Sequence, residues 1–246
     1  MISEFKTPTR IYELDVDKFV CNKFGIAEFF TKHFCAEDLG GGKSVLDVGC
    51  GVGPLALFFA DQFNCRVVGV EINGDACKCF HKNIRRFELS DFIAVEEENF
   101  ADYSGKIISQ NFDLIVSNPP IDEKITTSDI LKFKNSSFKH PNSSEFVYVT
   151  NSWHDNNGKD LLDHLFIFAK NHLAKSGKII LTCCSLDGAS EKTIFDRAAI
   201  YGFTSTKSIS GKITTASIGA ERSGLDTVDA FYVVLEREVE NEYRNS

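Results

Sequence analysis

Apolar and polar residues follow two regular patterns along the chain: short continuous apolar runs, and longer segments with helical spacing between them. Short apolar runs of this kind indicate strands that are covered on both faces, and intervening helices favour parallel pairing. We therefore predict strands at residues 44–48, 66–70, 92–95, 112–117 and 178–182, followed by two final strands at residues 203–210 and 230–236.

The segments between these strands place apolar residues at helical intervals. Residues 54–63 begin with a proline suited to a first helical turn, and residues 74–87 and 190–201 continue the pattern. Residues 161–177 carry an apolar stripe that we expect to end at Gly177, a typical C-cap residue. The alternation predicts an α/β fold: a doubly wound, mostly parallel seven-stranded sheet with helices on both faces.

Composition narrows the class of protein. The chain has 246 residues, of which 43% are hydrophobic, enough to bury a substantial core. No apolar run approaches the roughly 18 to 20 residues of a membrane span, and the start MISEFKTPTR lacks the apolar core of a secretory signal. We therefore expect a cytoplasmic protein that does not enter a membrane.

The net charge argues against a broad nucleic-acid-binding surface, and the cysteine spacing argues against a structural zinc or redox site. A formal net charge of -8 argues against a broad basic surface for nucleic acid, although a local basic groove stays open. The eight cysteines include no C-x-x-C pair, the spacing of structural zinc and thioredoxin-type redox sites. We expect no metal site.

A glycine-rich turn, DVGCGVG at residues 47–53, follows the first predicted strand. Gly49, Gly51 and Gly53 let the backbone turn tightly and approach a ligand, and the helix beyond presents unpaired backbone amides. The spacing is G-x-G-x-G, whereas a dinucleotide pyrophosphate is cradled by G-x-G-x-x-G. A strand-to-helix turn without a ligand is the structural alternative.

A carboxylate stands at the carboxyl end of the second predicted strand, beside the glycine turn. Glu71 directly follows RVVGV, and its two oxygens can each accept a hydrogen bond from one ribose hydroxyl. Nicotinamide cofactors use a similar acid, and a solvated Glu that opens the next helix is the plain alternative. Glu71 alone therefore does not select the cofactor.

The two segments together resemble a known family. VLDVGCGVGPLALFFA looks like the first motif, and VVGVEIN like the second, of class I S-adenosylmethionine methyltransferases, whose fold is Rossmann-like. The resemblance implies that Asp47 and the turn hold the amino-acid part of S-adenosyl-L-methionine, with Glu71 on the ribose and Ile72 against the adenine. It assigns to the cofactor Asp47, Gly49, Cys50, Gly51, Gly53, Glu71 and Ile72, with Asn99 and Phe100 at the adenine rim.

The motif SNPPI, residues 117–121, follows the fourth predicted strand. Pro119 and Pro120 fix backbone torsions and lack amide donors, which leaves carbonyl oxygens and the Asn118 side chain facing the crevice. An amide or aromatic amine is a poor nucleophile, and oxygen acceptors that hold its hydrogens aim its lone pair and stabilise the developing positive charge. We expect these three residues to be catalytic, with Asn118 also bordering the cofactor. An Asn-Pro turn that only ends a strand is the alternative.

This motif resembles the N-P-P-[YFW] signature of methyltransferases that act on exocyclic amines of nucleic-acid bases and on glutamine amides, including release-factor methyltransferases. The resemblance covers about residues 40–185, and one departure stands out: Ile121 replaces the usual aromatic residue. A stacking ring contributes roughly 1 to 3 kcal/mol per base, so its loss weakens the case for a flipped base more than for a smaller amide.

The resemblance also suggests how the chain is divided. We expect residues 1–43 to form an N-terminal extension on the cofactor side, and residues 44–237 to form the methyltransferase domain. Residues 121–157 are polar and too long for an ordinary connection, which indicates a lid or substrate insertion. Residues 238–246 are expected to form a flexible tail.

Several functions stay open at this point. The leading hypothesis is an S-adenosylmethionine-dependent N-methyltransferase whose acceptor is an RNA base or a protein glutamine. A small-molecule methyltransferase and a catalytically silent, methyltransferase-like partner subunit are alternatives, the latter supported by Ile121. An NAD-dependent oxidoreductase is disfavoured because the glycine spacing differs and the Asn-Pro-Pro motif would have no role.

Overall fold

The computed structural model describes residues 1–17, 23–39, 41–107, 109–119, 160–185, 190–219 and 224–238. Its principal strands are β3 (Ser44–Val48), β4 (Arg66–Glu71), β5 (Ile93–Glu97), β6 (Phe112–Ser117), β7 (Leu173–Cys184), β8 (Phe203–Thr214) and β9 (Thr227–Arg237). The helices between them are α2 (Pro54–Phe63), α3 (Gly74–Arg86), α4 (Phe100–Lys106), α7 (Leu161–His172) and α8 (Glu191–Ile200). The predicted insertion, residues 121–157, and all but residue 238 of the predicted tail lie outside the described residues.

Seven strands of the described chain form one sheet in the order β5-β4-β3-β6-β7-β9-β8. The strands β5, β4, β3, β6 and β7 are parallel, and β9 runs antiparallel to both β7 and β8. The predicted seven-stranded, mostly parallel sheet is confirmed. Strands β4 and β5 lie on one side of β3, and β6 and the later strands lie on the other. The carboxyl ends of β3, β4 and β6 therefore border the crevice in which doubly wound folds bind ligands.

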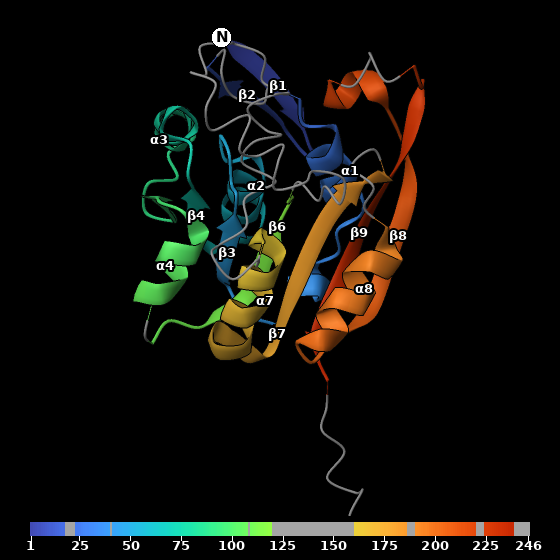
Figure 1. Ribbon diagram of the computed structural model, residues 1–246. Helices are drawn as coiled ribbons and strands as arrows, with labels where there is room; N and C mark the ends of the chain where they lie inside the picture. Colours follow the sequence, from blue (N-terminus) through green and yellow to red (C-terminus); the bar gives the residue numbers. More distant parts are fainter. Residues whose placement is uncertain are drawn as a thin grey trace, which may run out of the picture.

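Two layers of helices cover the sheet, and each closes over its own apolar cluster (Figure 1). Helices α2 and α3 pack on one face, where Phe59 and Phe80 are fully buried. Helices α4, α7 and α8 pack on the other face, around the fully buried Phe166. Helices on both faces were predicted, because the apolar runs that form β3, β4 and β6 are typical of strands that are covered on both sides.

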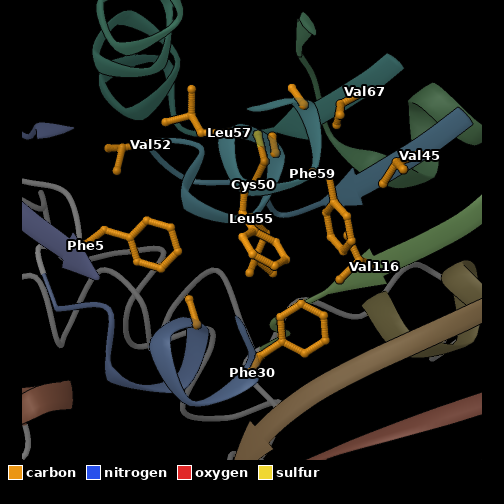
Figure 2. Close-up of a cluster of buried hydrophobic side chains, with 14 of the residues drawn as sticks. Phe5, Phe30, Val45, Cys50, Val52, Leu55, Leu57, Phe59, Val67 and Val116 are labelled. Carbon is orange, nitrogen blue, oxygen red and sulfur yellow. The ribbon is translucent and has the colours of Figure 1, made fainter. Parts of the chain in front are cut away.

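The N-terminal segment has a structure that the apolar pattern did not predict. Strands β1 (Ile2–Lys6) and β2 (Ile11–Asp15) form an antiparallel hairpin, followed by α1 (Gly25–His33) and the short 3-10 helix η1 (Ala36–Leu39). Figure 1 shows the hairpin at the upper end of the view, above α2 and α1. Figure 2 shows why this segment is ordered: Phe5 of β1 and Phe30 of α1 enter the same cluster as Phe59 of α2.

Several element boundaries differ from the prediction. Helix α7 ends at His172, not near Gly177, and Leu173 already pairs with Phe112 of β6. The next pair joins Lys178 to Leu114, so the residues around Gly177 form an irregularity within β7 and not a helix cap. Strands β8 and β9 also extend three to four residues beyond the predicted limits, to the pair Thr214 and Thr227, because the two strands continue to pair with each other.

Candidate functional site

The glycine turn lies at the carboxyl end of β3, between the ends of β4 and β6. Two consecutive backbone amides, those of Gly49 and Cys50, donate to the carbonyl of Val70 at 2.8 and 3.2 Å, which folds the turn over the end of β4. The Cys50 side chain is buried beneath the turn, and Figure 2 shows it in the core with Leu55. The turn is therefore anchored on its inner side by packing and on its outer side by hydrogen bonds.

The three glycines of the turn have different surroundings. All three have positive φ, 72° at Gly49, 57° at Gly51 and 90° at Gly53, a region that favours glycine. A Cβ at Gly53 would lie 1.9 Å from the Phe80 ring, whereas a Cβ at Gly49 or Gly51 would meet nothing within 4 Å. Gly53 is therefore required by packing, and the other two leave open space above the turn, as the predicted cofactor cradle requires.

Glu71 lies beside this open space and holds the turn. Its Oε2 accepts a hydrogen bond from Gly51 N at 2.9 Å, and its Oε1 accepts one from Asn73 N at 2.8 Å. Each carboxylate oxygen has a second lone pair, so both can still accept a ribose hydroxyl. Burial raises the pKa of Glu71, although the hydrogen bonds from Asn73, Gly51 and Ile72 lower it.

Asp47 supplies a second carboxylate, which is buried under the turn. Its Oδ2 accepts from Ala56 N in the first turn of α2 at 3.1 Å, and the residue is only 2% exposed. Burial raises the pKa of Asp47 to about 7, a rise that the Ala56 hydrogen bond opposes and the nearby charge of Glu71 reinforces. Among the described residues, no positive charge is a cause of the pKa shift of either carboxyl group.

Asn118 and Pro119 follow β6 at the same edge of the sheet. Ser117 pairs with Val48 of β3 and Leu181 of β7, and its hydroxyl donates to the Val48 carbonyl at 2.7 Å. That bond fixes the end of β6 to the residue that precedes the glycine turn. Asn118 is half-buried and Pro119 is buried, while Pro120 and Ile121 lie outside the described residues.

The predicted adenine contacts divide into two groups. Ile72 is 52% exposed at the end of β4, so its side chain is free to contact a flat ring. Asn99 caps α4, with Oδ1 accepting from Ala101 N at 2.9 Å, and it follows β5, the strand beside β4. Phe100 is buried in the core, its ring centroid 5.5 Å from that of Phe168, so its described contacts are with the core. Its place at the adenine rim stays a prediction.

Three residues that support the site were not singled out from the sequence. Ser117 ties β6 to β3, Phe80 fills the space against Gly53, and Asn83 of α3 donates to the Val52 carbonyl inside the glycine turn at 3.0 Å. A signal existed for Asn83 and Ser117, because each is a polar residue at a position whose neighbours in the pattern are apolar.

Known proteins resemble this chain over part of its length. Residues 26–140 match the family model of the methyltransferase small domain. The tRNA1(Val) (adenine(37)-N6)-methyltransferase of Porphyromonas gingivalis is 35% identical over 122 residues, 46% of this chain and 48% of that protein. The release factor glutamine methyltransferase of Borreliella burgdorferi is 26% identical over 201 residues, 78% of this chain and 63% of that protein. The chain thus spans about half, or less, of the length of the tRNA methyltransferases that it matches.

A solved structure agrees with the fold. A methyltransferase from Pyrococcus furiosus superposes with a TM-score of 0.56 at 18% identity, covering 91% of this chain and 88% of that one. This match supports the Rossmann-like architecture alone. Together with the family model and the curated relatives, it confirms the resemblance that the glycine turn and the Asn-Pro-Pro motif indicated.

The described residues hold neither a metal site nor a membrane-spanning helix. They include no group of His, Cys, Asp and Glu side chains arranged to hold a metal ion. Within the same residues, no helix is long and apolar enough to cross a membrane.

Proposed function

We propose that this chain, whose residues 26–140 match the methyltransferase small domain, is an S-adenosylmethionine-dependent N-methyltransferase that modifies a macromolecule. One observation carries the proposal: the open glycine turn, the Glu71 carboxylate and Asn118 meet at the adjoining carboxyl ends of β3, β4 and β6. This arrangement offers a nucleoside site and a nitrogen acceptor site side by side.

The electrostatics support S-adenosylmethionine over a nicotinamide dinucleotide. Asp47 is buried and Glu71 is half-buried, and within the described part of the chain no cation is among the causes of their pKa shifts. S-adenosylmethionine supplies an electrophilic methyl group on a sulfonium centre and carries an ammonium group, so it brings positive charge to this place. A dinucleotide would bring a pyrophosphate, which the two carboxylates repel.

Asn118 and Pro119 are the residues of this chain that act on the acceptor nitrogen. The Asn118 oxygen and the Pro119 carbonyl accept the hydrogens of the acceptor nitrogen, which directs its lone pair toward the methyl carbon. As the nitrogen gains positive charge, these fixed oxygens stabilise it more than they stabilise the neutral acceptor. A strongly basic side chain is not needed, because the proton becomes acidic once the nitrogen is methylated.

An exocyclic adenine amine in RNA is the acceptor that the relatives favour. Proteins named as tRNA adenine-N6 methyltransferases are 35% and 40% identical to segments of this chain in Porphyromonas gingivalis and Bacteroides fragilis. A glutamine side-chain amide is the second candidate, supported by the longer match to a release factor glutamine methyltransferase and by Ile121. We extend the proposal to a cytoplasmic activity, because both classes of substrate occur there.

The test begins with cofactor binding. S-adenosylhomocysteine should raise the melting temperature of the protein and NAD should not, with a stabilisation of about 2.7 kcal/mol at a hundred times the dissociation constant. A shift with NAD and none with S-adenosylhomocysteine would contradict the proposal.

The acceptor is then identified with S-adenosylmethionine carrying a labelled methyl group. Purified protein is incubated with total tRNA, with a protein extract and with the small-molecule fraction of the same cells. Label in tRNA that is recovered as N6-methyladenosine supports the first candidate, and label in protein glutamine supports the second. Label in small molecules alone, or cofactor binding with no transfer to any fraction, would contradict a macromolecular methyltransferase.

A further inference from the structure

A fully buried amide side chain joins the glycine turn to a distant part of the chain. Asn83 lies on α3 and is 0% exposed. Its Nδ2 donates to the Val52 carbonyl at 3.0 Å and to the Asp15 carbonyl at 3.2 Å, and its Oδ1 accepts from Asp15 N at 2.7 Å. Both ends of the amide are therefore bound to backbone groups, one set in β2 and the other in the turn.

The position of Val52 gives this contact its importance. Val52 lies between Gly51 and Gly53, both with positive φ, and glycine residues restrict the backbone less than any others. The peptide groups of the turn must therefore be held by their hydrogen bonds. Gly51 N donates to Glu71 on one side, and the Val52 carbonyl accepts from Asn83 on the other.

The same helix also holds the turn by packing. Phe80 lies one helical turn before Asn83 and contacts Gly53, where a Cβ would overlap its ring. Figure 2 shows the Val52 side chain in the cluster that includes Leu55 and Phe5. Residues at positions i and i+3 of a helix share one face, so Phe80 and Asn83 face the turn together.

We propose that Asn83 is a positioning residue for cofactor binding: it fixes the Val52 peptide and so keeps the glycine turn in the shape that receives the cofactor. The inference rests on the proposed function, and it adds the N-terminal hairpin to the cofactor site. Asn83 does not touch the open space above Gly49 and Gly51; it acts through the turn.

Arg86 provides a matched control on the same helix. Its guanidinium forms an ion pair with Asp15 at 2.6 Å and donates to the Glu13 carbonyl at 2.7 Å, so it holds the same end of the hairpin. Within the described chain, the ion pair and hydrogen bonds of Arg86 do not reach the glycine turn. Replacing Arg86 therefore weakens the attachment of the hairpin and leaves the Val52 peptide bound.

Three variants separate the positioning of the glycine turn from the attachment of the hairpin. Asn83→Asp keeps the oxygen that accepts from Asp15 N and replaces the donor by a second oxygen that faces the Val52 and Asp15 carbonyls. Asn83→Ala removes the amide without adding charge, which provides a folded alternative if the buried carboxylate prevents folding. Arg86→Met keeps the aliphatic stem and removes the contacts to the hairpin.

The measurement is the dissociation constant for S-adenosylhomocysteine by titration calorimetry, with the melting temperature of each variant measured in parallel. Loss of one hydrogen bond that holds a binding loop should raise the dissociation constant about tenfold in both Asn83 variants. Arg86→Met should lower the melting temperature and leave the dissociation constant within about twofold of wild type. With the acceptor present, the KM for the cofactor should rise, while kcat and the KM for the acceptor stay near wild type.

Two results would overturn the inference while leaving the proposed function intact. One is an Asn83→Ala protein that binds S-adenosylhomocysteine as tightly as wild type. The other is an equal loss of affinity in Arg86→Met, which would assign the effect to the hairpin as a whole. A wild-type protein that does not bind S-adenosylhomocysteine would instead remove the proposed function, and this inference with it.

Discussion

Replacement of Glu71 tests the cofactor site most directly, because the structure gives this carboxylate two measurable roles. It accepts backbone hydrogen bonds from Gly51 and Asn73 at 2.9 and 2.8 Å, and it borders the open space above the turn. Glu71→Ala removes both acceptors. A hydrogen bond to a charged group contributes about 1.5 to 3 kcal/mol, which sets an upper range of about 3 to 6 kcal/mol for the lost stability.

Two effects reduce this loss. Water can enter the space that the side chain leaves and bind the freed amides. Burial also raises the pKa of Glu71, which means that part of the benefit of its hydrogen bonds offsets the cost of burying its charge. We therefore expect the free energy of unfolding to fall by about 2 to 3 kcal/mol. Urea denaturation measures this value.

Cofactor affinity should fall as well, because Glu71→Ala also removes the acceptors for the ribose hydroxyls. The charge-assisted hydrogen bonds to a ribose are lost, and the loss of even one should weaken binding of S-adenosylhomocysteine by about 1.5 to 3 kcal/mol, or roughly ten- to a hundredfold. Asn73→Ala is the control: it removes the cap of α3, which accepts from Asp75 N and Ala76 N, at a cost of about 1 kcal/mol in stability. Its affinity should stay within a few fold of wild type. An unchanged dissociation constant in Glu71→Ala would refute the ribose assignment.

Five further substitutions test other parts of the site and one buried hydroxyl of the sheet. Asn118→Ala should keep cofactor affinity and lose about a hundredfold to a thousandfold in turnover with the identified acceptor; full turnover would leave the motif as a turn only. Gly51→Ala should place a methyl group in the open cradle and abolish cofactor binding at modest cost in stability, whereas Gly53→Ala should mainly destabilise the fold in a melting experiment. The pKa of Asp47 is raised to about 7, so its ionisation lowers the free energy of unfolding as the pH rises from about 4 to 7, and a bound cation favours the ionised form. Calorimetry should therefore show that the affinity of wild type for S-adenosylhomocysteine rises with pH up to about pH 7, by at most about tenfold per pH unit. The affinity of Asp47→Asn should depend less on pH. Thr182→Val should raise the free energy of unfolding by about 1 kcal/mol, because the buried Thr182 hydroxyl in β7 has no hydrogen-bond partner within the described chain. Urea denaturation should show a higher midpoint, and a lower midpoint would argue against this account.

The central sheet could be predicted because buried parallel strands leave a strong signal. Strands β3, β4 and β6 are continuous apolar runs bounded by glycine or polar residues, and their predicted limits agree with the structure within one residue. The glycine turn and Glu71 were predictable for a related reason. Each follows such a strand directly, so a correct strand assignment also placed the carboxyl edge of the sheet.

The hairpin and the limits of α7 depend on contacts that a local pattern does not contain. Strands β1 and β2 have five residues each, and only Phe5, Tyr12 and Leu14 among them are fully buried, too few for a distinct period. At Leu173 the helical pattern continues in the sequence, yet pairing with Phe112 of β6 ends the helix there. In both places tertiary packing determines the conformation more strongly than local propensity.

The glycine turn shows how much of a binding site lies outside its motif. A segment with three glycines at positive φ would sample many conformations if it were free, and a ligand would have to order it on binding. Three side chains remove that freedom in advance: Glu71 binds the Gly51 amide, Asn83 binds the Val52 carbonyl, and Ser117 binds the Val48 carbonyl at the end of β3. They come from β4, α3 and β6, so the shape of the turn depends on the two strands beside β3 and on the helix that follows β4. A chain that kept the glycines and lost these three partners should bind the cofactor more weakly, because the cost of ordering the turn would then fall on the binding step.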